Sequence, residues 1–373
     1  MHPRVRSADV DGGRRISDSD LPEPFGSLSR RGQLVRLRRL ANAALTGYGL
    51  STARLTTLRH EHNTTFRIDA DAGTYVLRIN RPGVYTPAMV ASEMAWLKAL
   101  RSETRLGVPE PVATRDGALV VVAEDDGVPE PRVCVVLRWQ EGRFLDDQLT
   151  PVRLRAVAAL QAGLQQHAVH WRPPDDFARP RVDTLTNAAK RDAVAQSAAS
   201  ALPGAHPSPD DADRARRLVA DLLSPAAGSV FDRALDSVWA ATDDLAAQPD
   251  SFGLIHADLH QENYLFGDGV ARAIDFDDCG WGFHLYDLAV TLSELEGRPR
   301  YAEMHRALLE AYARVRPLPD RHEAYLTAFI ALRRMQLITW ILESRKHAAF
   351  RDDWQPWAGK ELQALSAALG DRR

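Results

Sequence analysis

The sequence contains only two cysteines, Cys134 and Cys279, and they form no CxxC pair. A disulfide scaffold and a cysteine-rich zinc module are therefore not expected, and a reducing cytoplasm is the predicted compartment. Apolar runs long enough for a secretory signal or a membrane span are also missing, because the N-terminus is polar and the late segment 324–342 is interrupted by Arg333 and Arg334. We expect this segment to be a buried helix with a charged break, and we expect no membrane partner.

The chain has little net charge. It carries 47 basic and 50 acidic residues, and the formal charge of −3 gives no reason to expect a nucleic-acid partner. Only four of the basic residues are lysines. The length of 373 residues, 45% of them hydrophobic, is sufficient for two lobes that share a cleft.

The sequence pattern changes from β-like in the first part to helical in the second. Residues 1–28 are polar and expected to be disordered. Short β-like runs dominate residues 53–139, where an Asp/Gly-rich turn over 69–73 predicts a hairpin. Between them, residues 86–103 have helical spacing, with Val90, Met94 and Leu97 on one face. Helical periodicity dominates the second part, in which Ser229 and Asp232 have the spacing of a capping box. We therefore expect a small β-rich lobe, a larger α-rich lobe and a ligand site between them.

The stretch LIHADLHQEN, residues 254–263, concentrates chemically active side chains. Its two histidines, His256 and His260, could hold a metal together with nearby acids. Zinc proteases, however, place a glutamate directly after the first histidine of a helical motif, whereas here Ala257 follows His256 and a strand-like run precedes it. A His/Asp metallohydrolase stays open as an alternative, as do histidines that only form hydrogen bonds at a strand end.

The same stretch has the spacing H-x-D-x-x-x-x-N, formed by His256, Asp258 and Asn263. Kinase catalytic loops share this spacing, because a carboxylate orients the attacking hydroxyl while an amide oxygen faces a phosphate-bound metal. Asp275 follows twelve residues after Asn263 in the run AIDFDD, where kinases keep an aspartate that binds Mg²⁺. A plain acidic turn is the alternative for this run, and the correctly spaced upstream loop favours the metal ligand.

The β-rich lobe offers a matching cation for the phosphates. Arg78 in the run TYVLRIN takes the place of the kinase lysine, Val76 lies on the same strand face, and Glu93 in the next helix is the expected partner. An exposed Arg–Glu pair without a function is the alternative. The glycine-rich loop G-x-G-x-x-G is missing, so the hydroxyls of Thr64 and Thr65 are candidates to cover the phosphates, although loop threonines usually only form turns.

Taken together, the runs LIHADLHQEN, AIDFDDCGWGFHLYDLA, TYVLRINRPG and VVLRWQEGRFL resemble the aminoglycoside phosphotransferase and choline kinase-like family, over about residue 30 to the C-terminus. They look most similar to the branch of type II homoserine kinases and the bacterial stress-response Ser/Thr kinase. The resemblance implies an α+β, bilobal protein-kinase-like fold with a small antiparallel β-sheet N-lobe and a larger, mostly α-helical C-lobe. With the composition, it divides the chain into a tail (1–28), an N-lobe (29–137), a hinge (138–143) and a C-lobe (144–373).

The resemblance also implies roles for residues of the reaction centre. Asp258 would be the catalytic base, and Asn263 and Asp275 would bind Mg²⁺. Arg78, held by Glu93, would contact the phosphates of ATP.

Further residues would support this centre. Backbone groups around Leu137 and Trp139 would meet the adenine of ATP. His256 and Asp287 would have structural roles beneath the catalytic loop. His260 has a counterpart in some branches of the family, without an assigned role.

The acceptor is expected to bind between the catalytic loop and the C-terminal helices. Asp277, Asp278 and Trp281 are near enough in the sequence to line the entrance, and an acidic wall there suits an amine-bearing acceptor. Capping of a turn is an equal alternative for these residues. The expected function is transfer of the γ-phosphate of Mg–ATP to a hydroxyl of a small molecule such as an aminoglycoside, an amino alcohol, homoserine or choline. A protein Ser/Thr kinase, a non-catalytic nucleotide-binding protein and the metallohydrolase remain alternatives, and the sequence does not indicate the oligomeric state.

Overall fold

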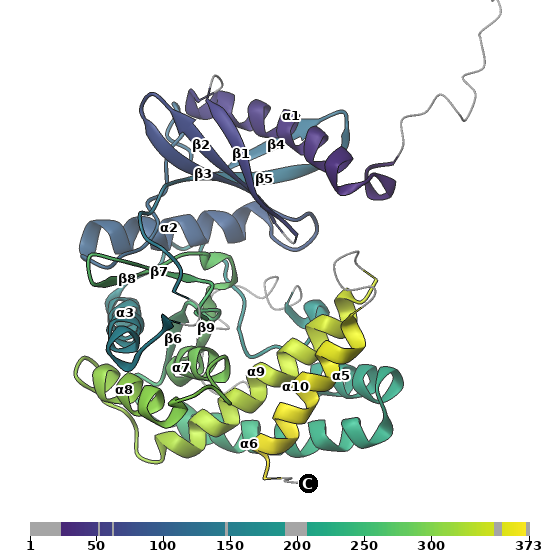
Figure 1. Cartoon of the computed structure of the whole chain (residues 1–373), viewed down its shortest axis with the longest axis vertical. Coiled ribbons are helices and arrows are strands. Elements are labelled where there is room, and N and C mark those ends of the chain that lie inside the picture. The colour runs from purple at the N-terminus through teal and green to yellow at the C-terminus, as the bar shows by residue number, and fades with distance from the viewer. Residues whose placement is uncertain are drawn as a thin grey trace, which may run out of the picture.

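The computed structural model describes residues 24–50, 53–61, 63–145, 148–190, 207–346 and 353–370. A small lobe with a β-sheet lies above a larger helical lobe (Figure 1). The predicted α+β bilobal fold is therefore confirmed. The predicted disordered tail falls mostly on residues 1–23, which lie outside the described residues, and Phe25–Ser27 form a short 3-10 helix.

The small lobe contains a five-stranded antiparallel sheet of order β1-β2-β3-β5-β4. The strands are β1 (Arg54–His60), β2 (Thr64–Ala70), β3 (Gly73–Ile79), β4 (Val121–Asp125) and β5 (Val128–Arg138). The hairpin predicted over 69–73 joins β2 to β3, and its register sets Thr65 opposite Arg78. Cross-strand partners share a face of the sheet, so this register decides which side chains can accompany Arg78.

Helix α1 (Arg30–Tyr48) covers one face of the sheet. It begins after Ser29, whose side chain accepts a hydrogen bond from the backbone of Gly32, and it ends at Gly49 with a φ of 73°. A hydroxyl at the N-cap and a left-handed glycine after the last turn are favourable helix boundaries. The buried residues of α1 form a separate hydrophobic cluster with the sheet.

Helix α2 (Pro87–Glu103) lies between the sheet and the large lobe (Figure 1). Its predicted apolar face is confirmed, because Val90, Met94 and Leu97 are all buried. These residues belong to the same hydrophobic cluster as the core of the large lobe. The helix that carries Glu93 is therefore packed as part of the large lobe as much as of the small one.

The large lobe is mostly helical. Its helices in the described ranges are α3 (Pro151–His170), α5 (Pro209–Leu222), α6 (Pro225–Ala246), α7 (His284–Ser293), α8 (Tyr301–Ala313), α9 (His322–Ser344) and α10 (Trp354–Ala368). None of the helices in these ranges has the length and apolarity needed to cross a membrane.

One local prediction for the large lobe is wrong. Helix α6 begins after Ser224, which accepts a hydrogen bond from Ala227, because Pro225 at the first helical position has the φ that a helix needs. The capping-box spacing of Ser229 therefore lies inside the helix. The buried helix predicted over 324–342 is confirmed as part of α9. Arg333 and Arg334 interrupt its apolar run but remain within the regular helix, because both have acidic partners.

Two short hairpin-like pairs carry the motifs of the large lobe. Strand β6 (Phe252–Ile255) pairs with β9 (Gly280–Phe283), and β7 (Tyr264–Gly267) pairs with β8 (Val270–Ala273). The HADLHQEN run connects β6 to β7, and the AIDFDD run ends in a 3-10 turn, Phe276–Asp278, between β8 and β9. The two motifs are therefore presented side by side at the top of the helical lobe.

Candidate active site

The carboxylate of Asp258 lies at the centre of the loop between β6 and β7. Its Oδ1 accepts a hydrogen bond of 2.5 Å from Nη2 of Arg333 on α9. Its Oδ2 accepts one of 3.0 Å from Nδ2 of Asn263 and lies 3.4 Å from Nε2 of His260. Burial opposes the charge, but Arg333 and His260 outweigh it and hold the pKa of Asp258 well below its usual value. Asp258 is therefore an oriented, ionised carboxylate.

The backbone of this loop is held from below by Asp287 on α7. Its carboxylate is fully buried and accepts hydrogen bonds from the backbone amides of His256 (3.2 Å) and Ala257 (2.7 Å). Ala257 has a φ of 71°, a strained value for a residue with a Cβ, so two amides held by one carboxylate stabilise an otherwise unfavourable turn. His256 reaches the other motif, since its Nε2 lies 3.0 Å from the carbonyl oxygen of Ile274.

Asn263 and Asp275 lie on adjacent segments, because the amide of Ile274 donates to the carbonyl of Asn263 over 2.9 Å. Asn263 uses its Nδ2 for Asp258, which leaves the amide oxygen for another ligand. Asp275 has a φ of 62° and lies 3.8 Å from Nη1 of Arg78. The surrounding protein and the neighbouring carboxylate of Asp277 raise the pKa of Asp275 well above its usual value. A cation at this place would relieve that repulsion.

Arg78 and Glu93 form a buried pair. The guanidinium donates two hydrogen bonds to the carboxylate, one of 2.9 Å and one of 2.5 Å. Burial opposes the charge of Arg78, and Glu93 more than compensates by raising its pKa. Because both Nη atoms of Arg78 bind the carboxylate of Glu93, the guanidinium is held in one orientation, beside Asp275.

The sheet face around Arg78 places the other predicted nucleotide contacts. Val76 lies opposite Leu137 in the β3–β5 register, and Thr65 lies opposite Arg78, so these side chains share one face. Trp139 follows the end of β5 and donates its backbone amide to Thr74, and the guanidinium of Arg67 lies 4.8 Å from its ring centroid.

Thr64 does not belong to this face. Its side chain is buried, and its hydroxyl lies 2.8 Å from Nδ1 of His60. Of the two threonines expected to cover the phosphates, only Thr65 therefore shares the sheet face of Arg78. The physical reason is strand alternation, which turns neighbouring residues to opposite faces of the sheet.

The β1–β2 connection takes the place of the missing glycine-rich loop. Asn63 donates a hydrogen bond of 2.7 Å from its Nδ2 to Oδ2 of Asp277, and Arg59 lies 3.4 Å from Oε2 of Glu262. The connection thus contacts both motifs of the large lobe. Burial and the neighbouring Asp278 carboxylate raise the pKa of Asp277.

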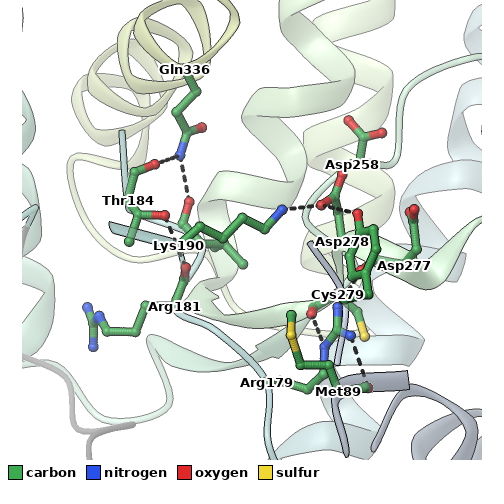
Figure 2. Close-up of polar contacts among 12 residues, drawn as sticks. Met89, Arg179, Arg181, Thr184, Lys190, Asp258, Asp277, Asp278, Cys279 and Gln336 are labelled. Carbon is green, nitrogen blue, oxygen red and sulfur yellow. Dashed lines mark hydrogen bonds and ion pairs between the residues drawn. The ribbon is translucent and has the colours of Figure 1, made fainter. Parts of the chain in front are cut away.

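Asp278, one of the residues expected to line the acceptor entrance, accepts a hydrogen bond from a lysine. Figure 2 shows Lys190 reaching Asp278 beside Asp258. The hydroxyl of Tyr85 also donates to Asp278, over 3.3 Å. Burial works against ionisation of Asp278, and Lys190 lowers its pKa below the usual value. Trp281 lies on β9, and its ring is edge-on to Phe177 with 6.0 Å between the centroids.

Several of these contacts were not found from the sequence. Arg333 could have been suspected, because a charged residue in an apolar helix needs a buried partner. Lys190, Asn63 and Tyr85 carry no local signal, since each meets its partner across a large sequence separation.

The arrangement gives no support to the zinc alternative. The ring of His256 is fully buried and hydrogen-bonded through its two nitrogens to Ile274 and to the backbone of Asp258. Nowhere in the described ranges do three His, Cys, Asp or Glu side chains come together as a metal cage. A zinc ion needs such a set, whereas Mg²⁺ shared with phosphates needs only one or two protein oxygens.

Comparison with known proteins agrees with this geometry. Residues 55–325 match the phosphotransferase enzyme family. A homoserine kinase of Gluconacetobacter diazotrophicus is 27% identical over 281 residues, which cover 72% of this chain and 74% of the kinase. The solved structure of a microcompartment-associated aminopropanol kinase is 26% identical, with a TM-score of 0.72 over 89% of this chain and 98% of that one.

A second solved structure shows the same fold at lower identity. The amicoumacin kinase hAmiN, solved with AMP-PNP and Ca²⁺, is 18% identical, with a TM-score of 0.68 over 91% of this chain and 96% of that one. The predicted small-molecule phosphotransferase with a protein-kinase-like fold is thereby confirmed. This chain belongs to the phosphotransferase enzyme family.

Proposed function

We propose that the enzyme transfers the γ-phosphate of Mg–ATP to the hydroxyl of a small, amine-bearing acceptor. Asp258 orients that hydroxyl for in-line attack and takes its proton as the new oxygen–phosphorus bond forms, while the bond from the γ-phosphorus to the bridging oxygen breaks and ADP leaves. Arg78 contacts the phosphates from the sheet, with Thr65 beside it. The observation that carries the proposal is the position of Asp258, held at both carboxylate oxygens and adjacent to Asn263.

The residues present fit a divalent cation between Asn263 and Asp275. The amide oxygen of Asn263 remains available, and the side chain of Asp275 is 43% exposed, so a cation can reach it. Two protein oxygens match the preference of Mg²⁺ to complete its shell with phosphates and water. When bound, the cation neutralises charge on the phosphates during transfer.

An ammonium group on the acceptor is supported by the environment of Asp278. This carboxylate already binds the ammonium of Lys190, and it lies beside Asp258 (Figure 2). An acceptor that carries an amine and a hydroxyl could place the first on Asp278 and the second on Asp258. Aminopropanol, the substrate of the structurally similar kinase, has this composition.

The test is transfer of labelled γ-phosphate from Mg–ATP to a panel of amino alcohols, hydroxy amino acids, aminoglycosides, sugars and a generic basic protein. Asp258→Asn should lower transfer by about 10²- to 10⁴-fold while ATP still binds. Asp268→Asn is the matched control, because Asp268 is an almost fully exposed aspartate of the same lobe. Transfer only to the basic protein, or full activity of Asp258→Asn, would refute the proposal.

A further inference from the structure

The connection after α3 crosses the active site as an extended segment, residues 177–186, which we call the strap. Its backbone pairs with β9: Trp281 donates its amide to Pro180 over 2.9 Å, and Val182 donates to Trp281 over 3.0 Å. From the other side, Gln336 on α9 donates to the carbonyls of Val182 (2.6 Å) and Thr184 (2.9 Å). The strap is thus fixed between the metal-binding motif and the acceptor-side helix (Figure 2).

Arg179 is the residue of the strap that contacts both helix α2 and the turn after Asp275. It is 5% exposed, and its guanidinium donates to three backbone carbonyls. Nε donates to Cys279 over 2.6 Å, Nη2 donates to Asp277 over 2.5 Å, and Nη1 donates to Met89 over 3.2 Å. Figure 2 shows these contacts converging on one guanidinium.

The three carbonyls belong to the two elements that must be aligned for nucleotide binding. Asp277 and Cys279 form the turn that follows Asp275. Met89 is in the first turn of α2, four residues before Glu93, so its carbonyl belongs to the same helical turn as the amide of Glu93. A second bond supports this tie, because the amide of Ala178 donates to Oγ of Ser92 over 2.8 Å.

These contacts close a ring. On one side, Glu93 holds Arg78, and Arg78 faces Asp275 at 3.8 Å. On the other side, Arg179 joins the turn after Asp275 back to the helix of Glu93. Helix α2 is therefore connected to the metal-binding motif twice, once through side chains across the nucleotide site and once through backbone carbonyls behind it.

We propose that Arg179 is a positioning residue that locks helix α2 and the metal-binding turn in the alignment required for Mg–nucleotide binding. The inference rests on the proposed function. In protein kinases, the position of the corresponding helix is variable and controls activity. Here a buried arginine holds the helix directly to the metal-binding turn. The alignment is thus part of the fold and needs no activating modification.

The test compares Arg179→Met and Arg179→Lys with the wild-type protein. Each removes charged hydrogen bonds to carbonyls, and Met removes all three. We expect Arg179→Met to weaken binding of an ATP analogue in the presence of Mg²⁺ by about 10- to 100-fold. Binding of the same analogue in EDTA should change by less than about threefold, because only the alignment with Asp275 is lost. The KM of the acceptor should stay within about twofold.

The matched control is Arg316→Met. Arg316 is similarly buried and donates to the carbonyl of Asp250 over 2.9 Å, but it lies near α7 and α8, outside the active site. The Arg316→Met protein should be less thermally stable than the wild-type protein, but Mg²⁺ should affect its binding of the ATP analogue as it does in the wild-type protein. A second readout is rescue: millimolar guanidinium should restore Mg²⁺-dependent binding to Arg179→Ala and have no such effect on Arg316→Ala.

Two results would overturn the inference. One is that Arg179→Met and the wild-type protein show the same ratio between the affinity for the ATP analogue with Mg²⁺ and the affinity in EDTA. The other is an equal change of that ratio in Arg316→Met, which would show general destabilisation. If the wild-type protein itself binds no ATP analogue, the proposed function fails, and this outcome is distinct because it does not depend on Arg179.

Discussion

The guanidinium of Arg333 on helix α9 lies 2.5 Å from Oδ1 of Asp258, so the carboxylate proposed as the catalytic base is paired with a cation from the C-terminal part of the chain. Both side chains are mostly buried. The next residue, Arg334, faces a different direction and pairs with Glu361 and Glu296. Two adjacent arginines of one helix therefore serve the active site and the packing of α10 respectively.

Arg333→Met should lower kcat by about 100-fold, because a carboxylate displaced by even about 1 Å no longer orients the acceptor hydroxyl. The KM of ATP should change little, since Arg333 lies on the acceptor side. Steady-state kinetics with both substrates varied measure this separation. Arg334→Met is the neighbouring control and should lower the melting temperature while kcat is kept. Equal kinetic effects of the two variants would contradict the assignment.

The buried pair of Arg78 and Glu93 gives a prediction about stability. Arg78→Met leaves the Glu93 carboxylate buried without its partner, which should cost about 3–5 kcal/mol of unfolding free energy. The double variant with Glu93→Leu should recover much of that loss, since neither charge is then buried, but it should remain inactive. Urea unfolding of the three proteins measures the difference. A double variant no more stable than Arg78→Met would argue against an isolated buried pair.

A lysine at position 78 is predicted to support ATP binding less well than the arginine. Lysine can donate to Glu93 but lacks the planar fork that forms two parallel bonds. Arg78→Lys should therefore raise the KM of ATP by about tenfold, the value of one hydrogen bond to a charged group. A KM equal to that of the wild-type enzyme would show that the arginine reflects only the scarcity of lysine in this chain.

Lys190 and Asp278 should affect the acceptor in opposite directions. Lys190→Met removes an ammonium that competes for Asp278, so the KM of an amine-bearing acceptor should fall about two- to fivefold. Asp278→Asn should raise the same KM about tenfold. The matched substrate is a diol of the same length without the amine, for which neither variant should change KM. If the variants changed the KM of the diol as much as that of the amine-bearing acceptor, Asp278 would not bind the ammonium group of the acceptor.

The elements and motifs that the sequence predicted correctly are those determined by residues close together in the chain. The helical spacing of Val90, Met94 and Leu97 predicted α2, and the turn over 69–73 predicted the hairpin that places Arg78. The pairing of Arg78 with Glu93 followed from motif order in the same way. Each of these depends on residues close in the chain.

Contacts between distant segments were not predictable in this way. Arg333 meets Asp258 across 75 residues and Arg179 meets Met89 across 90, so the packing of α9 and of the strap decides both. The burial of Thr64 was not predictable either, because the face to which a strand residue turns depends on the register with β1 and β3. The start of α6 was misplaced because Pro225 and Ser224 are a better helix start than the capping-box spacing that follows them.

His284 at the start of α7 gives a prediction about pH. Burial and the neighbouring Arg316 lower its pKa from 6.5 to about 3, so the folded protein keeps this ring neutral. The unfolded chain binds a proton there below pH 6.5, and stability should therefore fall as the pH decreases from 6.5 toward 3. The slope from this one group approaches about 1.4 kcal/mol per pH unit.

Replacing His284 with asparagine removes this titration. The asparagine side chain is neutral throughout the range, and its amide can still donate to the carbonyl of Asp250 that contacts the histidine ring. Urea unfolding at a series of pH values should therefore show a shallower loss of stability for His284→Asn than for the wild-type protein between about pH 6.5 and 5. Any constant difference at pH 7.5 reports packing and is subtracted. If the stability of His284→Asn and of the wild-type protein fell equally with pH, the His284 ring would be protonated in the folded protein as readily as in the unfolded chain. Its positive charge beside Arg316 would then need a neighbouring anion to balance it.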